Sequence, residues 1–137
     1  MKVKFCVLGE PKGKGRPRVS TRNGFARAYT PKDTANYENL VRYTYQSDVG
    51  VMLQGDITAR ITAYFPIPKS VSKKQRQAML DGVIPHTKKP DCDNIAKIIL
   101  DSLNEVAYND DKQIYRVTVE KWYSDRPRVE IELESKE

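Results

Sequence analysis

The sequence predicts a single α+β domain, β-α-β-α-α-β-β in order, with helices packed on a mixed four-stranded sheet. Four segments alternate between apolar and polar residues, as half-buried strands do. Two segments carry apolar residues at three- and four-residue steps, and a third has the start and stop signals of a helix. The 137 residues suit one compact domain, and they contain no repeat or linker.

The strands are expected at residues 2–8, 57–65, 115–121 and 129–133. In the first strand, Val3, Phe5 and Val7 face inward. Pro66 ends the second, because proline cannot continue a strand ladder. The last two strands are joined only by residues 124–127, a link short enough to predict an antiparallel hairpin.

The first helix is expected over residues 30–47, with Thr30 as its cap, Pro31 at the first position and Asp33 in the first turn. A short second helix begins at Ser70 or Ser72 and ends at Gly82.

The third helix follows Pro90, and Asp93 or Asn94 is expected to cap its first turn. Its apolar stripe consists of Ile95, Ile98, Ile99, Leu103 and Val106. On a neighbouring face, Asp93, Lys97 and Asp101 follow one another at four-residue steps.

The composition, 39% hydrophobic and 31% charged, predicts a soluble globular protein. No apolar run approaches the roughly 18 residues of a membrane span, and no signal-peptide pattern opens the chain. We therefore expect a cytoplasmic location and no membrane partner. Two cysteines and one histidine do not make a zinc-ligand set.

The net charge of +6 is unevenly distributed. Residues 1–90 carry 17 basic and 6 acidic side chains, whereas residues 91–137 carry 7 basic and 12 acidic ones. A basic body with an acidic C-terminal part fits a nucleic-acid binder that keeps its carboxylates for a metal ion. The alternative is a generically basic protein.

Residues 11–28 are rich in glycine, lysine and arginine, and their glycines and prolines predict an irregular loop. Backbone phosphate contacts are its expected use, and a merely solubilising loop is the alternative. The expected DNA-binding residues are Lys12, Lys14, Arg16, Arg18, Lys88, Lys89, Asn94 and Lys97.

The most informative stretch is residues 88–114, in which Asp91, Asp93, Lys97 and Asp111 surround the third helix. Carboxylates are the ligands that Mg²⁺ prefers, and a nearby lysine can stabilise charge developing on a phosphate. Each residue also has a plainer interpretation. Asp93 can be only a cap, Lys97 only a surface ion pair, and Asp110-Asp111 only a turn.

These residues resemble the RusA-type Holliday junction resolvases, DNA endonucleases of bacteria and phages. The resemblance rests on Pro90-Asp91-x-Asp93-Asn94, Lys97, Leu100-Asp101-x-Leu103-Asn104 and Asn109-Asp110-Asp111-x-Gln113-Ile114, and it extends to Gly9-x-Pro11-Lys12-x-Lys14-x-Arg16-Pro17-Arg18 and Tyr29-Thr30-Pro31.

The resemblance implies metal-binding, catalytic aspartates at Asp91, Asp93 and Asp111 and an essential lysine at Lys97. It also implies a homodimer that acts on branched DNA in recombination and repair, with Mg²⁺ as the cofactor and Mn²⁺ as its substitute. The choice between Asp110 and Asp111 stays open, because the linker after the helix varies in length.

Two other functions remain open. Pro90-Asp91 and Asp110-x-Lys112 fit the loose pattern of a restriction-like nuclease, although that pattern requires its second half within a strand. The non-enzymatic alternative is a basic DNA-binding module whose acidic residues serve only as caps and solvated charges.

Overall fold

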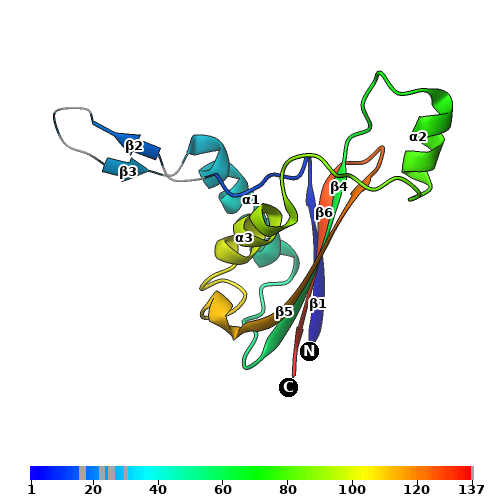
Figure 1. The fold of residues 1–137 in the computed structure, drawn as a ribbon. Coiled ribbons are helices and arrows are strands. Elements are labelled where there is room, and N and C mark those ends of the chain that lie inside the picture. Colours follow the sequence, from blue (N-terminus) through cyan, green and yellow to red (C-terminus); the bar gives the residue numbers. More distant parts are fainter. Residues whose placement is uncertain (16–17, 22–23, 25–26, 30, 137) are drawn as a thin grey trace.

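A computed structural model describes residues 1–15, 18–21, 24, 27–29 and 31–136 (Figure 1). Of residues 18–20 and 27–29 it describes only the backbone. The elements are β1 (Lys2–Leu8), β2 (Arg18–Ser20), β3 (Arg27–Tyr29), α1 (Lys32–Asp48), β4 (Ile57–Phe65), α2 (Lys73–Leu80), α3 (Cys92–Ser102), the 3₁₀ turn η2 (Asp111–Gln113), β5 (Ile114–Tyr123) and β6 (Arg128–Ser135). The predicted α+β class is confirmed.

The main sheet has the strand order β1-β6-β4-β5. It is mixed, because β6 is antiparallel to both β1 and β4, whereas β5 is parallel to β4. The expected hairpin between β5 and β6 is wrong, since β4 lies between them. Their short link spans the roughly 10 Å between strands two positions apart, which four residues can cover at about 3.3–3.6 Å each.

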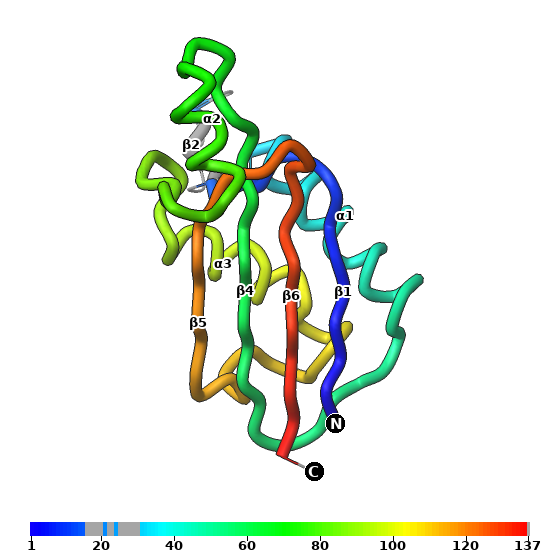
Figure 2. Tube along the Cα trace, turned by 90° about the vertical axis from the view of Figure 1, so that its right-hand side faces the viewer, coloured from blue at the N-terminus to red at the C-terminus, as the bar shows by residue number. Residues whose placement is uncertain are grey.

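The core lies between one face of the sheet and the helices α1 and α3 (Figure 2). The central strand β4 buries every second side chain on that face: Ile57, Ala59, Ile61, Ala63 and Phe65. Full burial of one large aliphatic or aromatic side chain contributes about 1.5–3 kcal/mol. No helix packs on the other face of the main sheet within the described residues.

The helix boundaries agree with the sequence in part. Pro31 occupies the cap position of α1 rather than its first turn, and Asp33 lies in that turn as expected. Thr30, the expected cap, lies outside the described residues. Helix α2 is capped by Ser72, whose hydroxyl accepts from the backbone N–H of Gln75, so the second of the two expected start residues is confirmed.

Helix α3 ends at Ser102, and Val106 therefore lies in the turns that follow it rather than in the expected helical stripe. The backbone N–H of Asn104 donates to the carbonyl of Asp101, which tightens the end of the helix. Glu105 has a φ of 65°, a conformation in which an α-helix cannot continue.

The basic segment is more regular than expected. Strands β2 and β3 pair antiparallel within it, so the prediction of an irregular loop is wrong for residues 18–20 and 27–29. Gly24, in the turn between them, has a φ of 77°, which is why the chain can reverse there. Figure 1 shows this hairpin projecting from the helix-bearing side of the sheet.

The described residues include no helix long and apolar enough to cross a membrane.

Candidate active site

The site begins where helix α3 begins. Asp91, rather than Asp93 or Asn94, occupies the cap position, and its side chain makes no capping hydrogen bond. Asp93 follows in the first turn, and both aspartates are exposed. Among the described residues neither carboxylate is held in an ion pair, which leaves their oxygens open to a ligand. The predicted capping by Asp93 or Asn94 is therefore wrong.

A lysine of the sheet fixes the backbone that leads into this turn. The ammonium of Lys121 in β5 donates to the carbonyl oxygens of Lys88, at 2.6 Å, and Pro90, at 2.9 Å. The backbone N–H of His86 donates in turn to the carbonyl of Lys121. Lys121 thus anchors the chain one residue before Asp91.

Sequence reasoning missed this role, although the pattern contains a signal for it. Lys121 continues the alternation of Val117 and Val119, so it lies on the face of β5 that the helices cover. A lysine on such a face needs acceptors for its ammonium.

Lys97 lies one turn further along α3, and its ammonium is 3.5 Å from a carboxylate oxygen of Asp101. The same oxygen is 3.5 Å from the ammonium of Lys14, which donates at 2.9 Å to Glu38 in α1. Lys14 and its two partners are each about a fifth exposed (21%, 21% and 16%), so this network is shielded from solvent more than a surface ion pair.

The charge of Lys14 is already matched within the protein. Burial lowers the pKa of Lys14, but the hydrogen bonds and negative charges of Glu38 and Asp101 outweigh burial and raise it. The Lys14 backbone N–H also donates to the carbonyl of Asn94 in α3. Lys14 therefore joins the basic segment to α1 and α3, whereas the sequence predicted a phosphate contact.

The start of the basic segment is packed closely against the start of α3. A Cβ placed on Gly13 would lie 2.7 Å from the Cβ of Pro90 and 3.2 Å from that of Asn94. Only glycine therefore fits at this position without displacing the turn that carries Asp91.

Asp111 lies in the 3₁₀ turn η2, at the far end of α3. Its backbone N–H donates to the side-chain oxygen of Asn104 at 2.8 Å, which ties the turn to the end of the helix. Burial and the neighbouring carboxylates of Asp110 and Asp101 raise the pKa of Asp111. Negative charge thus accumulates here, and a cation would relieve it.

Asp110 has a structural task. One of its oxygens caps η2 by accepting from the backbone N–H of Lys112, and that bond lowers the pKa of Asp110. Gln113 completes the capping box by accepting from the backbone N–H of Asp110. Asp110 thus acts as the turn residue that its sequence suggested.

Lys112 also lies in this turn and not within a strand. The Asp110-x-Lys112 half of the restriction-like pattern therefore lacks the strand context that the pattern requires.

Asp91 and Asp93 lie at one end of α3, and Asp111 lies beside Asp101 at the other. Eight residues separate Asp93 from Asp101, a rise of about 12 Å along the helix. Within the described residues, no three His, Cys, Asp or Glu side chains are grouped closely enough to hold a metal ion. As donors the predicted ligands suit Mg²⁺, since all are carboxylates, and those of Asp91 and Asp93 are exposed.

The predicted DNA-binding residues occupy different environments. Lys12, Lys88, Lys89, Asn94 and Lys97 are exposed, whereas Lys14 is half-buried. Arg16 lies outside the described residues, and Arg18 begins β2 with its side chain undescribed.

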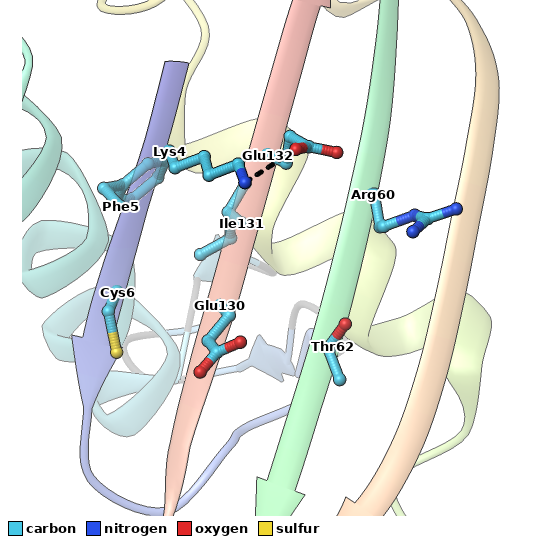
Figure 3. Close-up of a pocket in the computed structure, with 8 residues that line it drawn as sticks. All are labelled: Lys4, Phe5, Cys6, Arg60, Thr62, Glu130, Ile131 and Glu132. Atoms are coloured by element: carbon cyan, nitrogen blue, oxygen red, sulfur yellow. Dashed lines mark ion pairs between the residues drawn. The ribbon is translucent and has the colours of Figure 1, made fainter. Parts of the chain in front are cut away.

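A depression of about 470 Å³ lies elsewhere, on the helix-free face of the sheet (Figure 3). The charged side chains around it include Lys4, which pairs with Glu132 at 3.4 Å, and Arg60. None of the predicted catalytic or DNA-binding residues lines it.

The chain is similar to known proteins over almost its whole length. Residues 9–134 match the family described as Endodeoxyribonuclease RusA. The chain is also 38% identical over 132 residues to a Bacillus subtilis (strain 168) protein described as "Uncharacterized protein YqaN", and the match covers 94% of this chain and 93% of that protein.

Proposed function

Because the chain belongs to the RusA family of endodeoxyribonucleases, we propose that it is a Mg²⁺-dependent endonuclease that resolves four-way DNA junctions. One observation carries this assignment beyond the family. Helix α3 presents exposed Asp91 and Asp93 at its start, Lys97 one turn later, and the Asp101–Asp111 carboxylates at its end. Carboxylates that can bind a metal ion, with a cation beside them, are suited to phosphodiester hydrolysis.

The proposed metal ligands are Asp91, Asp93 and Asp111, with Mn²⁺ as a substitute for Mg²⁺. Asp91 and Asp93 lie together at the start of α3, whereas Asp111 lies beside Asp101 at its other end, so one ion bound by all three would require these ends to come closer than they are in this structure. When bound, the ion polarises the phosphoryl group and lowers the pKa of a coordinated water. Without a cation, this acidic surface would repel the DNA backbone. That repulsion supports a catalytic rather than an adhesive role for the three aspartates.

Lys97 is the proposed catalytic cation. Its side chain is 62% exposed, and Asp101 holds its ammonium near the acidic residues. An ammonium in this position can stabilise the negative charge that develops on the phosphoryl oxygens. Asp101 and Lys14 act on Lys97 as positioning residues, and Lys121 acts in the same way on Asp91.

The DNA backbone is proposed to contact the exposed residues Lys12, Lys88, Lys89, Asn94 and Lys97. Arg16 and Arg18 of the basic segment are proposed as further contacts. Such contacts fix the position of the DNA without reading its sequence.

The proposed assembly is a homodimer, because resolving a junction takes two matched cuts and a two-fold dimer presents two equivalent sites. The exposed edge of β5 offers one surface for it: Tyr115 is 56% exposed and Val117 42%. The proposed setting is recombination and repair in the cytoplasm of a bacterium, with either a chromosomal or a phage gene.

The test is cleavage of a labelled four-way junction and of a linear duplex of matched sequence, with Mg²⁺, with Mn²⁺ and with excess chelator. We expect paired cuts in the junction that require the metal ion. Asp93→Asn should bind the junction and leave it intact. Normal cleavage by Asp93→Asn, or cleavage in chelator, would contradict the assignment, and salt-sensitive binding without any product would support the non-enzymatic module.

A further inference from the structure

Between β4 and α3 the chain makes an excursion, residues 66–85, which we call the α2 arm. Its base is closed by aromatic stacking. The rings of Phe65 and His86 are parallel, with centroids 3.7 Å apart, and Tyr123 meets His86 edge-on at 5.2 Å. The backbone N–H of Ser124 donates to the carbonyl of Phe65, so the base of the arm is joined to the ends of β4 and β5.

Beyond this base the arm contacts the core through a few apolar residues: Met79 is buried, and Ile67, Val71 and Ile84 pack against the core. In α2 only Met79 is buried, and Figure 1 shows α2 standing away from the sheet, on the side opposite the β2–β3 hairpin. These apolar residues hold the arm on the core, and the rest of its surface, which carries its cations, is largely exposed. Segments held outside the core by a rigid base are disproportionately binding elements.

The exposed surface of the arm is basic. Its cations, all exposed, are Lys69, Lys73, Lys74 and Arg76. None of these four takes part in an ion pair among the residues that the structure describes. The single acidic residue, Asp81, accepts a hydrogen bond from the side chain of Gln77. The arm therefore presents cations that the protein itself does not neutralise.

The segment that contains the arm and the basic N-terminal segment together account for the protein's basic character. Residues 11–29 and 66–90 together carry twelve basic side chains and one acidic one, a net +11, whereas the rest of the chain carries 12 basic and 17 acidic, a net −5. The positive charge is thus concentrated in two segments, one containing β2 and β3 and the other containing α2. In Figure 1 these elements lie on opposite sides of α3.

The arm also leads directly to the candidate site. From His86 the chain runs through Lys88 and Lys89 to Asp91, and Lys121 holds the carbonyls of Lys88 and Pro90. The orientation of the arm relative to the start of α3 is therefore set by the sheet. A polyanion bound along the arm would extend toward Asp91 and Asp93.

We propose that the α2 arm is a second DNA-binding element, whose exposed Lys73, Lys74 and Arg76 bind backbone phosphates beside the scissile bond. This inference rests on the proposed function, and it assigns a role to a segment outside the acidic site. The contacts are electrostatic and independent of sequence, so neutralising them should weaken binding and reduce its dependence on salt.

The experiment uses Asp93→Asn as a non-cleaving parent. Its equilibrium binding to a four-way junction is measured from about 50 to 300 mM salt. This range includes the concentrations, about 0.05–0.2 M, over which binding through phosphate contacts weakens steeply. The test variant adds K73Q, K74Q and R76Q, because glutamine preserves helix propensity. The control adds K2Q, K4Q and K136Q, the same change in charge near the chain termini, which lie away from α2 (Figure 1). Circular dichroism and thermal melting establish that both variants fold.

We expect the arm variant to bind at least about tenfold more weakly at 0.1 M salt, with the slope of log K against log salt reduced by about one for each phosphate that the arm no longer binds. The control should keep the parent's slope. An arm variant that behaves like the control, while the parent binds and the wild-type protein cleaves, overturns this inference and leaves the nuclease assignment intact. A parent that binds no DNA overturns both.

Discussion

Replacing Lys14 by methionine removes one ammonium from the network that joins the basic segment to both core helices. Methionine keeps most of the length and apolar surface of the lysine stem. Glu38 would lose its partner at 2.9 Å, and Asp101 would keep only Lys97. The variant separates two roles for Lys14, as a phosphate contact and as a positioning residue.

The expected loss of stability follows from the geometry. A hydrogen bond to a charged group contributes about 1.5–3 kcal/mol, and the three side chains are only about a fifth exposed. We expect Lys14→Met to lower the free energy of unfolding by about 2 kcal/mol. At roughly 3 °C per kcal/mol for a domain of this size, the melting temperature should fall by about 6 °C.

The assay compares Lys14→Met with Lys12→Met, its exposed neighbour, and it includes junction cleavage as well as binding. Lys14→Met should leave the salt dependence of binding unchanged and slow single-turnover cleavage by about tenfold, equivalent to about 1.4 kcal/mol. Asp101 would still pair with Lys97, but without Lys14 the Asp101 carboxylate would be less firmly positioned and would hold Lys97 less rigidly. Lys12→Met should leave the melting temperature unchanged and reduce the salt slope by about one.

The reverse pattern would refute the reasoning. If Lys14→Met melts like the wild-type protein and loses as much salt dependence as Lys12→Met, Lys14 is a phosphate contact in solution. The network with Glu38 and Asp101 would then be replaced when DNA binds.

Three further predictions concern other parts of the site and its support. Lys97→Ala should lower the cleavage rate by about 10²–10³ while Lys112→Ala changes it less than about twofold, and equal losses would favour the restriction-like pattern. Burial and the charges of Lys121 and Lys88 lower the pKa of His86 to about 4. The folded state favours the neutral form of His86. The contribution of His86 to the free energy of unfolding is therefore complete above about pH 6.5 and is lost as the pH falls toward 4, by up to about 3 kcal/mol. Chemical denaturation across this range should show the loss in the wild-type protein and not in His86→Phe. Lys121→Met should raise the Mg²⁺ concentration needed for half-maximal cleavage without weakening junction binding in chelator, and an unchanged Mg²⁺ requirement would show that Lys121 only supports the loop.

Local patterns predicted the elements of the fold well. Strict alternation located β4, because a central strand buries one face completely. Side-chain chemistry limited the start of α2 to Ser70 or Ser72. The structure selects Ser72, whose hydroxyl forms a capping box with Gln75. These patterns involve residues that are close together in the sequence, so they can be recognised without knowing the fold.

The pairing of β5 with β4 could not be predicted from local patterns. A link as short as residues 124–127 can join two adjacent strands in a hairpin. It can equally well join two strands that have a third strand between them. The arrangement of all four strands decides between them, and β4 takes the place between β5 and β6.

The candidate site shows the same limit. Sequence spacing placed Asp93, Lys97 and Asp101 on one face of α3, and the Lys97–Asp101 contact agrees with that placement. The partners of Lys14 and Lys121 come from distant segments, 24 residues away for Glu38 and 31 for Pro90. No local pattern identifies such partners. The sequence therefore predicted only a DNA contact for Lys14 and a position in a strand for Lys121.

The parallel pairing of β4 with β5 has a consequence for the spacing of the acidic groups. A chain that leaves the end of one strand and enters the beginning of its parallel neighbour must travel back along the sheet, and α3 makes part of that return. The length of α3 therefore sets the distance between the carboxylates at its two ends. Each turn inserted or deleted between Ile95 and Leu100 would change their separation by about 5.4 Å while leaving the composition of the charged ends untouched.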